Sequence, residues 1–376
     1  MVSDMRILSR LLRDSEVYSI LEKALHGDKL MLQDIKNLMK SQDTHLIGLV
    51  ADKIRKEIVG DTVTFIPNQI LNYTNICTVR CDFCAFYRNK GSKDSYTLTP
   101  SQVIDRAVKA WSQYNTRQVL IQGGVNPELT IEYYEEIFRG IKEKTENLAI
   151  HGLSTSEIEF ISKKEKMSIR EVLQRLQNSG LDSIPGAGGE ILVDRIREKM
   201  RRRLSSADGW LRVMEEAHNL SIPTSATMMY GHIESDTDRA EHIHKIRELQ
   251  EKSGGFMAFI GWNFEPGSTK LERDGLVTRS VGGRELLRIV AAARIVFREL
   301  IPNIQSSWLT NSIPIAQIAL VYGANDWGGT LYDEEVIPAT GKQVRDLKIQ
   351  DIVYSVKNIN RQVAERDNFY KIVRYL

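Results

Sequence analysis

The chain begins with apolar residues at helical spacing. Over residues 1–60, leucine, isoleucine, valine and methionine recur every three or four positions between charged side chains, and Gly60-Asp61 ends the run. This spacing is typical of amphipathic helices that bury one face. We therefore predict a helical extension over residues 1–60.

Beyond residue 60, short apolar runs alternate with longer amphipathic ones. Eight short runs have the length and composition of buried strands: 63–71, 118–121, 148–151, 183–185, 224–228, 257–262, 304–308 and 317–321. Such alternation is typical of a parallel sheet, and eight strand–helix units fit a barrel. The sequence predicts an α/β fold, a (β/α)8-type TIM barrel over residues 61–345, with a helical segment over 346–376 packed on it.

Capping signals support the helices between these strands. Thr99-Pro100 followed by Gln102 combines an N-cap, a first-turn proline and a capping-box partner. Ser168 with Glu171 forms a second capping box. These signals predict helices that begin near residues 100 and 169.

Polar and glycine-rich segments follow the predicted strands. They read NYTNICTVRC, QGGVNP, HGLSTSE, PGAGGE, MMYGH, WNFEPGST, QSSW and YGANDWGG. One such segment would be an ordinary tight turn, whereas eight of them, several with His, Glu, Asp or Trp, favour a site. Because barrel active sites are built at the carboxyl ends of the strands, we expect the site there.

Composition and charge exclude several classes of protein. The 376 residues are 42% hydrophobic and 27% charged, as in soluble globular proteins. The net charge is +2, so we expect no nucleic-acid partner, and the basic run 195–203 is interpreted as a solvated helix face. No apolar run approaches the roughly 20 residues that cross a bilayer, and the charged N-terminus does not resemble a secretory signal. We expect a cytoplasmic protein with no membrane partner.

The three cysteines point to a metal site. Cys77, Cys81 and Cys84 form a C-x3-C-x2-C motif directly after the first predicted strand. Three thiolates on one loop can each bind one iron of a 4Fe–4S cube, whose fourth iron then lacks a cysteine ligand. A structural zinc site needs a fourth protein ligand from outside the motif, and a disulfide framework is not expected from an odd cytoplasmic trio. The motif favours a cluster with one iron open to an external ligand.

With its aromatic residue before the last cysteine, this motif resembles the radical S-adenosylmethionine (SAM) superfamily. The resemblance covers roughly residues 60–345 and implies an enzyme with two cofactors, a 4Fe–4S cluster and SAM. In that family the open iron binds SAM, which is cleaved to a 5′-deoxyadenosyl radical that abstracts hydrogen from substrate. A closed barrel protects such a radical from water.

The resemblance also assigns SAM-binding residues. Phe83 corresponds to the adenine contact, and Gln122-Gly123-Gly124 corresponds to the turn that binds the methionine end. In the segment PGAGGE, Glu190 is assigned to the ribose hydroxyls or to substrate, and Arg197 to the methionine carboxylate. Each has a plainer interpretation, since QGG also suits an ordinary turn and Glu190 a helix N-terminus.

A finer resemblance is to a subgroup: the cyclic dehypoxanthine futalosine synthases of menaquinone biosynthesis, the aminofutalosine synthases and the deazaflavin-forming synthases. The segments CAFYR, QSSW and GANDWGG favour the first of these. GAGG in place of the more usual GGGA order, together with Gly261 and Glu265, departs from the pattern. The implied reaction is abstraction of hydrogen from C4′ of dehypoxanthine futalosine, followed by ring closure and loss of one electron and one proton.

This reaction needs a proton acceptor. We predict His232 as the first choice, with Glu234, Asp326 and Glu190 as alternatives. A packed histidine that hydrogen-bonds to backbone is the competing interpretation of His232.

The remaining predictions concern substrate and partners. Arg88 or the hydroxyls of Ser306-Ser307 are candidates for the substrate carboxylate. The resemblance implies an external one-electron donor such as flavodoxin or ferredoxin. An Fe–S electron-transfer protein is the non-enzyme alternative, but such a protein normally gives its cluster four cysteines.

Overall fold

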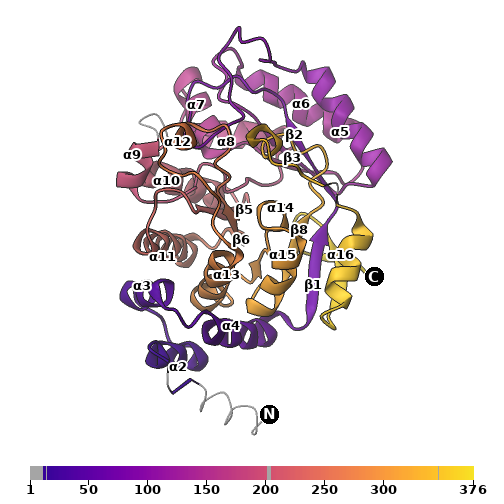
Figure 1. Ribbon diagram of the computed structural model, residues 1–376. Helices are drawn as coiled ribbons and strands as arrows, with labels where there is room; N and C mark the ends of the chain where they lie inside the picture. Colours follow the sequence, from indigo (N-terminus) through magenta and orange to yellow (C-terminus); the bar gives the residue numbers. More distant parts are fainter. Residues whose placement is uncertain (1–11, 14, 201–204, 346) are drawn as a thin grey trace.

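The computed structural model describes residues 12–13, 15–200, 205–345 and 347–376. In this part of the chain, parallel strands form a central ring that helices surround (Figure 1). The strands are β1 (Thr62–Ile66), β2 (Asn68–Asn72), β3 (Gln118–Gln122), β4 (Ala149–Gly152), β5 (Thr224–Tyr230), β6 (Phe256–Asn263), β7 (Asn303–Ile304), β8 (Asp326–Gly329), β9 (Gln362–Arg366) and β10 (Ile372–Tyr375). The α/β fold and its barrel are as predicted.

Three sheets and a set of isolated bridges close the ring. The sheets have the orders β10-β9-β1-β8, β2-β3-β4 and β5-β6-β7. Parallel bridges from Ser183 to His151 and from Ile184 to Thr224 join β4 to β5. A bridge between Gln305 and Asp326 joins the end of β7 to β8. The predicted strand at 183–185 is therefore present only as these single bridges.

The predicted strand 63–71 is divided at Pro67. Proline has no N–H to donate to a neighbouring strand, so the ladder is interrupted at this residue. Below the break β1 pairs with β8 and β9, and above it β2 pairs with β3. One apolar run thus serves two sheets.

The helices cover the outside of the ring and extend beyond it. They are α2 (Tyr18–His26), α3 (Leu32–Lys40), α4 (Thr44–Val59), α5 (Pro100–Tyr114), α6 (Ile131–Lys144), α7 (Thr155–Glu165), α8 (Ile169–Asn178), α9 (Asp194–Met200), α10 (Ala207–Asn219), α11 (Asp236–Ser253), α12 (Lys270–Arg273), α13 (Gly283–Phe297), α14 (Trp308–Asn311), α15 (Ile313–Ala319) and α16 (Ile349–Lys357), with 3-10 turns η1 (Leu320–Tyr322) and η2 (Pro338–Thr340). The predicted capping boxes begin α5 and α8. None of the helices in the described residues is long and apolar enough to cross a membrane.

The N-terminal helices pack against the barrel's outer helices. In Figure 1, α2, α3 and α4 lie together at one end of the molecule, where α3 contacts α11 and α4 contacts α13. An ion pair from Lys36 to Glu241 (3.1 Å) joins the first of these contacts. The extension is helical as predicted from residue 18 onward, and residues 1–11 and 14 of that prediction lie outside the described residues.

The prediction of a strand at 317–321 is wrong. These residues complete α15 and form η1, and the barrel strand is Asp326–Gly329. Pro314 lies in the first turn of α15, and Ala316, Ala319 and Leu320 are buried at helical spacing. An apolar run of five residues fits either structure, and the proline decides for the helix.

The prediction that residues 346–376 are helical is also corrected. The helix α16 is followed by β9, which pairs in parallel with β1, and by the antiparallel strand β10. Below Pro67, β3 does not reach the edge of β1, and β9 takes up the hydrogen bonds there. The end of β9 and the loop after it carry residues 366–370 toward the inside of the barrel, where Arg366, Asn368 and Tyr370 line a cavity.

Candidate active site

The cysteine loop follows β2 and is anchored at both ends. Cys77, Cys81 and Cys84 are free thiols and each is partly buried. The N–H of Cys77 donates to the carbonyl of Arg88 (3.1 Å), and that of Thr78 to the carbonyl of Val125 (3.0 Å). The loop is thereby held against the turn that follows β3.

Arg88 holds the loop from within. One of its terminal nitrogens donates to the carbonyls of Ala85 (2.9 Å), Phe86 (3.1 Å) and Tyr87 (3.0 Å), and its Nε pairs with Asp94. This guanidinium is committed to the loop's backbone. Its contacts offer no support for the prediction that it binds a substrate carboxylate.

The three thiols influence one another electrostatically. Burial raises the pKa of the Cys81 thiol well above its ordinary value; Cys84, Glu190 and Cys77 raise it further, and Arg197 lowers it. Burial likewise raises the pKa of Cys84 to about 11. Thiols placed this way ionise when a metal takes up their charge, which fits an iron–sulfur cluster. Within the described residues, no group of three or more His, Cys, Asp or Glu side chains is arranged to hold a single metal ion. A 4Fe–4S cube does not need such a group, because each thiolate binds a different iron.

The turn Gln122-Gly123-Gly124 lies against the cysteine loop. A Cβ on Gly124 would stand 2.3 Å from the carbonyl oxygen of Ile76 and 2.9 Å from Cβ of Cys77. A Cβ on Gly123 would stand 2.7 Å from the ring of Tyr73. Both positions require glycine because backbone and ring approach so closely.

A buried carboxylate behind this turn was not predicted. Glu157 accepts hydrogen bonds from the N–H of Gly123 (3.3 Å), the hydroxyl of Tyr73, and the N–H (2.6 Å) and hydroxyl (2.5 Å) of Ser154. Burial raises the pKa of Glu157 to about 7. Ser154 and Glu157 form a capping box for α7. That pattern was visible in the sequence, but its contact with Gly123 depends on the fold.

Glu190 lies between the thiols and the barrel interior. Its φ is 24°, a left-handed conformation that a non-glycine residue seldom adopts. The Oε2 atom is buried and has no hydrogen-bond partner among the described residues, and burial raises the pKa of the carboxyl. A buried carboxylate oxygen without a partner fits a residue that receives hydroxyl groups of a ligand.

Arg197 braces the loop that carries Glu190. Its guanidinium donates to the carbonyls of Gly188 (2.9 Å), Gly189 (3.1 Å) and Ser205 (2.6 Å). The predicted pairing with the methionine carboxylate would compete with these bonds. The part of the basic run at 201–203 lies outside the described residues.

The barrel encloses a cavity of about 310 Å³. At the carboxyl ends of the strands, Gln122 and Glu190 line it, so two of the predicted SAM residues face the same space. Phe83 is partly buried and packs against the core at the cysteine loop. The walls are largely apolar, and the volume is at the lower end of the range for small-molecule sites. The aromatic wall includes Trp262 and Trp308.

The loop from residue 366 to 370 forms the floor of this cavity. Arg366, Asn368 and Tyr370 line it. Asn368 accepts a hydrogen bond from the side chain of Gln118, the first residue of β3 (2.7 Å). The C-terminal segment thus closes the barrel at the amino ends of its strands.

Two further predicted contacts lie at or beside the cavity. Ser307 lines it, and its hydroxyl has no partner among the described residues, which agrees with a substrate contact. Glu265, the unusual acid in WNFEPGST, pairs with Lys342 and accepts a hydrogen bond from Ser280 (2.7 Å). Its negative charge is therefore balanced within the protein.

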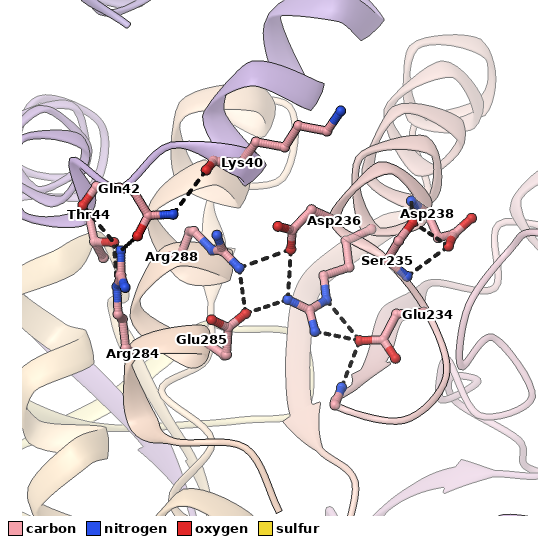
Figure 2. A network of polar contacts seen from close by, with 12 residues as sticks. Lys40, Gln42, Thr44, Glu234, Ser235, Asp236, Asp238, Arg284, Glu285 and Arg288 are labelled. Atoms are coloured by element: carbon pink, nitrogen blue, oxygen red, sulfur yellow. Dashed lines mark hydrogen bonds and ion pairs between the residues drawn. The ribbon is translucent and has the colours of Figure 1, made fainter. Parts of the chain in front are cut away.

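His232 and Glu234 do not line this cavity. Both side chains are fully buried in the loop after β5, where Nε2 of His232 donates to the carbonyl of Met229 (3.1 Å). Glu234 binds Arg239, which also pairs with Asp236 and Glu285. Figure 2 shows this network between the barrel helices and the N-terminal extension. The geometry agrees with the competing interpretation of His232 as a packed histidine.

Asp326 is buried and paired. Its carboxylate accepts hydrogen bonds from Arg366 (2.6 and 3.0 Å) and from the hydroxyl of Thr64 (2.6 Å). Both oxygens of this carboxylate are therefore already occupied by donors within the protein. The role of Asp326 in proton transfer stays a prediction that these contacts do not favour.

His151 is a cavity residue that the sequence analysis did not select. It lies in β4, pairs in register with Leu120 of β3, and lines the cavity with it. Alternation along β3 turns Gln118, Leu120 and Gln122 inward, so the register turns His151 inward as well. This register was the missing information, since HGLSTSE by itself does not show which side chain faces the interior.

Comparison with known families agrees with this geometry. Residues 71–246 match the profile of the radical SAM superfamily, and residues 253–374 match the CofH/MqnC C-terminal region. The chain is 37% identical to a 5-amino-6-(D-ribitylamino)uracil–L-tyrosine 4-hydroxyphenyl transferase of Methanopyrus kandleri, over 88% of this chain and 90% of the relative. It is 35% identical to a cyclic dehypoxanthine futalosine synthase of Halalkalibacterium halodurans, over 94% of both chains.

Solved structures with this fold include two proteins of low identity. Methylornithine synthase superposes with a TM-score of 0.69 at 18% identity, over 91% of this chain and 96% of its own. The FeFe-hydrogenase maturase HydG of Carboxydothermus hydrogenoformans gives a TM-score of 0.73 at 16% identity, over 97% of this chain and 83% of its own. Both support the barrel fold.

Proposed function

Because this chain belongs to the radical SAM superfamily, in the branch that carries the CofH/MqnC C-terminal region, we propose that it is a cyclic dehypoxanthine futalosine synthase of menaquinone biosynthesis. Family membership establishes a radical SAM enzyme and implies a 4Fe–4S cluster and SAM. The proposed substrate loses the hydrogen at C4′, closes a ring onto its aromatic carboxylic acid, and gives up one electron and one proton.

The residues present fit both cofactors. Cys77, Cys81 and Cys84 would hold the cluster, since no other thiols occur in the chain. Gln122-Gly123-Gly124 would receive the methionine end of SAM, because Gly124 leaves room for the backbone beside Cys77. Glu190 would bind the ribose hydroxyls through its unpaired oxygen, and Phe83 would contact adenine. When bound, the cofactors supply the hydrogen-abstracting radical.

The protein's own residues would position the cofactors and the substrate and would enclose them away from solvent. Arg197 fixes the backbone around Glu190, and Glu157 fixes the turn at Gly123. The loop 366–370 closes the floor, which keeps solvent from a reactive intermediate. An external one-electron donor of the flavodoxin or ferredoxin type would complete the reaction.

The segments QSSW and GANDWGG carry the choice of reaction, because they favour the cyclase and both reach the cavity. Ser307 and Trp308 of the first segment and Trp327 of the second segment line it together with Glu190. Ring closure within a single molecule needs no second substrate. The transferase named for the Methanopyrus relative acts, by its name, on two molecules, a ribitylaminouracil and tyrosine. It is the second candidate function, favoured by 37% identity over 88% of this chain.

Parallel anaerobic incubations test the proposal. The reconstituted enzyme, SAM and reductant would be combined with dehypoxanthine futalosine in one reaction and with 5-amino-6-(D-ribitylamino)uracil plus tyrosine in another. Mass analysis should show a product two hydrogens lighter than substrate in the first and no coupled product in the second. The reverse result would assign the transferase reaction, and 5′-deoxyadenosine without either product would exclude both substrates.

A further inference from the structure

His151 stands in the cavity wall between the floor and the predicted SAM residues. Its register partner Leu120 lies two residues after Gln118, which contacts the floor, and two residues before Gln122. At about 3.3 Å per residue, His151 is about 7 Å from each layer. A small substrate that reaches Gln122 and Glu190 also reaches this imidazole.

A chain of hydrogen bonds orients the ring. Oδ1 of Asn368 accepts from Gln118 (2.7 Å), while Nδ2 of Asn368 donates to the hydroxyl of Ser183 (3.0 Å). Ser183 is 2.7 Å from Nδ1 of His151. The Ser183 hydroxyl proton has two acceptors within reach, Nδ1 of His151 at 2.7 Å and Oδ1 of Asn368 at 3.2 Å. Because Oδ1 already accepts from Gln118, the shorter contact assigns this proton to Nδ1. The ring proton then lies on Nε2, which none of these bonds occupies.

The imidazole is a neutral donor. Burial, with a smaller contribution from the Arg366 guanidinium, lowers the pKa of His151 to about 3. At neutral pH the ring therefore carries one proton and no charge. It can offer an N–H to an oxygen acceptor, but it is too weak a base to hold a second proton.

Hydrogen-bond acceptors and donors are distributed unevenly along the cavity. At the carboxyl ends of the strands stand the carboxyl groups of Glu190 and of Glu334, which follows β8. Toward the floor stand the amide side chains of Gln118 and Asn368 and the guanidinium of Arg366, whose charge Asp326 balances. An anionic group of a substrate needs donors, which it finds at the second end rather than the first.

We propose that Nε2–H of His151 binds the ring carboxylate of the substrate and so makes the site specific for an aromatic carboxylic acid. This inference rests on the proposed function and deepens it. Held at the carboxylate, the aromatic ring lies toward the floor and the sugar lies toward Glu190. That orientation presents C4′ to the end of the cavity where SAM is expected.

Binding measurements on the unreduced holoenzyme test the inference without turnover. Anaerobic calorimetry in the presence of SAM would compare dehypoxanthine futalosine with an analogue that lacks the ring carboxylate. Wild type should prefer the carboxylate by about 10- to 100-fold, the range expected for a hydrogen bond to a charged group. In His151→Phe this preference should disappear because only the carboxylate ligand weakens, and His151→Gln, which retains an N–H, should recover part of it.

A matched control is another buried histidine. His218 bonds Ser253 and Thr224 and does not line the cavity. The substitution His218→Phe should leave the ligand preference unchanged. Equal weakening of both ligands in His151→Phe would mean that the ring acts by packing alone, which overturns the inference.

A third ligand identifies the oxygen that is bound. An analogue that keeps the carboxylate but lacks the sugar hydroxyls should lose affinity equally in wild type and His151→Phe. If the loss of affinity caused by removing the sugar hydroxyls is seen in wild type but not in His151→Phe, then His151 binds a hydroxyl. That result would overturn the carboxylate assignment. If wild type neither binds nor cyclises dehypoxanthine futalosine, the proposed function itself fails; if it cyclises that substrate and His151→Phe keeps the carboxylate preference, the inference alone fails.

Discussion

Among the buried acidic residues, hydrogen bonding decides which are free to react. Glu234 accepts from the N–H of Gly231 (2.7 Å) and of His232 (2.9 Å) and pairs with Arg239. Glu190 is equally buried, yet one of its oxygens has no partner among the described residues. A satisfied carboxylate stabilises a loop, whereas an unsatisfied one is available to a ligand. On this basis Glu234 is a structural residue, and Glu190 is a candidate ligand contact.

Replacement of His232 tests its assignment to structure. Because its ring is fully buried and Nε2 is bonded to Met229, His232→Gln should lower stability by about 1–3 kcal/mol. If the proposed reaction is right, the variant should still form one cyclised product per 5′-deoxyadenosine, the same ratio as that expected of wild type. Quantification of both products by chromatography measures this ratio. Excess 5′-deoxyadenosine in the variant would restore His232 as a substrate contact or proton acceptor.

Glu157 gives the protein a specific dependence of stability on pH. Burial raises its pKa from 4.5 to about 7, so the folded protein retains a proton that the unfolded chain releases in this window. The resulting stabilisation is complete below pH 4.5 and is lost as pH rises to about 7. Between pH 5 and 8, wild type should lose about 2.5 kcal/mol relative to Glu157→Gln. Urea unfolding of both proteins at the two pH values measures the difference, and parallel curves would contradict the shift.

Single residues were predictable where spacing alone specifies the chemistry. The intervals between Cys77, Cys81 and Cys84 needed no fold, and the glycines of the QGG turn followed from the family resemblance. His151 was not predictable, because whether it faces the interior depends on its register with Leu120. His232 was chosen for its place after a strand, but that loop turns the ring back onto the backbone of Met229.

At the scale of elements, proline and glycine decide where the predicted pattern holds. The apolar runs at β3, β5 and β6 lie near their predicted positions. Pro67 divides the first strand, and Pro314 turns the run at 317–321 into a helix. The strand β9 was missed because it pairs with β1, 300 residues away in sequence, as the pairing of Thr62 with Gln362 shows. Local patterns do not carry such pairings.

The contact between the glycine turn and the cysteine loop can be tested with one methyl group. In Gly124→Ala the new Cβ would stand 2.3 Å from the Ile76 carbonyl, so the cysteine loop must move. SAM affinity and iron content should both fall by at least tenfold while the barrel stays folded. Gly282→Ala is the matched control, since its Cβ would meet nothing within 4 Å. Unchanged SAM affinity in Gly124→Ala would mean that the turn has no part in cofactor binding.

At the scale of the molecule, the two ends of the chain complete the barrel in different ways. The N-terminal helices cover α11 and α13 from outside. The C-terminal segment adds β9 beside β1 and then inserts residues 366–370 into the barrel. The floor of the cavity therefore comes from residues close to the end of the chain, far in sequence from the cysteine loop. The sequence pattern predicted neither the strand β9 beside β1 nor the position of residues 366–370 inside the barrel.

The buried pair of Asp326 and Arg366 anchors that floor, and breaking it should affect both stability and binding. In Arg366→Met the Asp326 carboxylate stays buried without its partner, which should cost about 3–5 kcal/mol. Adding Asp326→Asn removes the uncompensated charge, so the double variant should regain much of the loss. Arg345→Met, which breaks an exposed pair with Asp351, should cost far less.

The same variants connect the floor to the substrate. Asn368, which orients His151 through Ser183, lies in the loop that Arg366 anchors. Displacing this loop should weaken substrate binding in Arg366→Met, while SAM, which we expect at the opposite end of the cavity, should bind as before. Urea unfolding and calorimetry with each ligand measure the two effects separately. Equal weakening of SAM and substrate binding would show that the loop supports the barrel as a whole. Full substrate affinity in a destabilised Arg366→Met variant would show that the floor does not contribute to substrate binding.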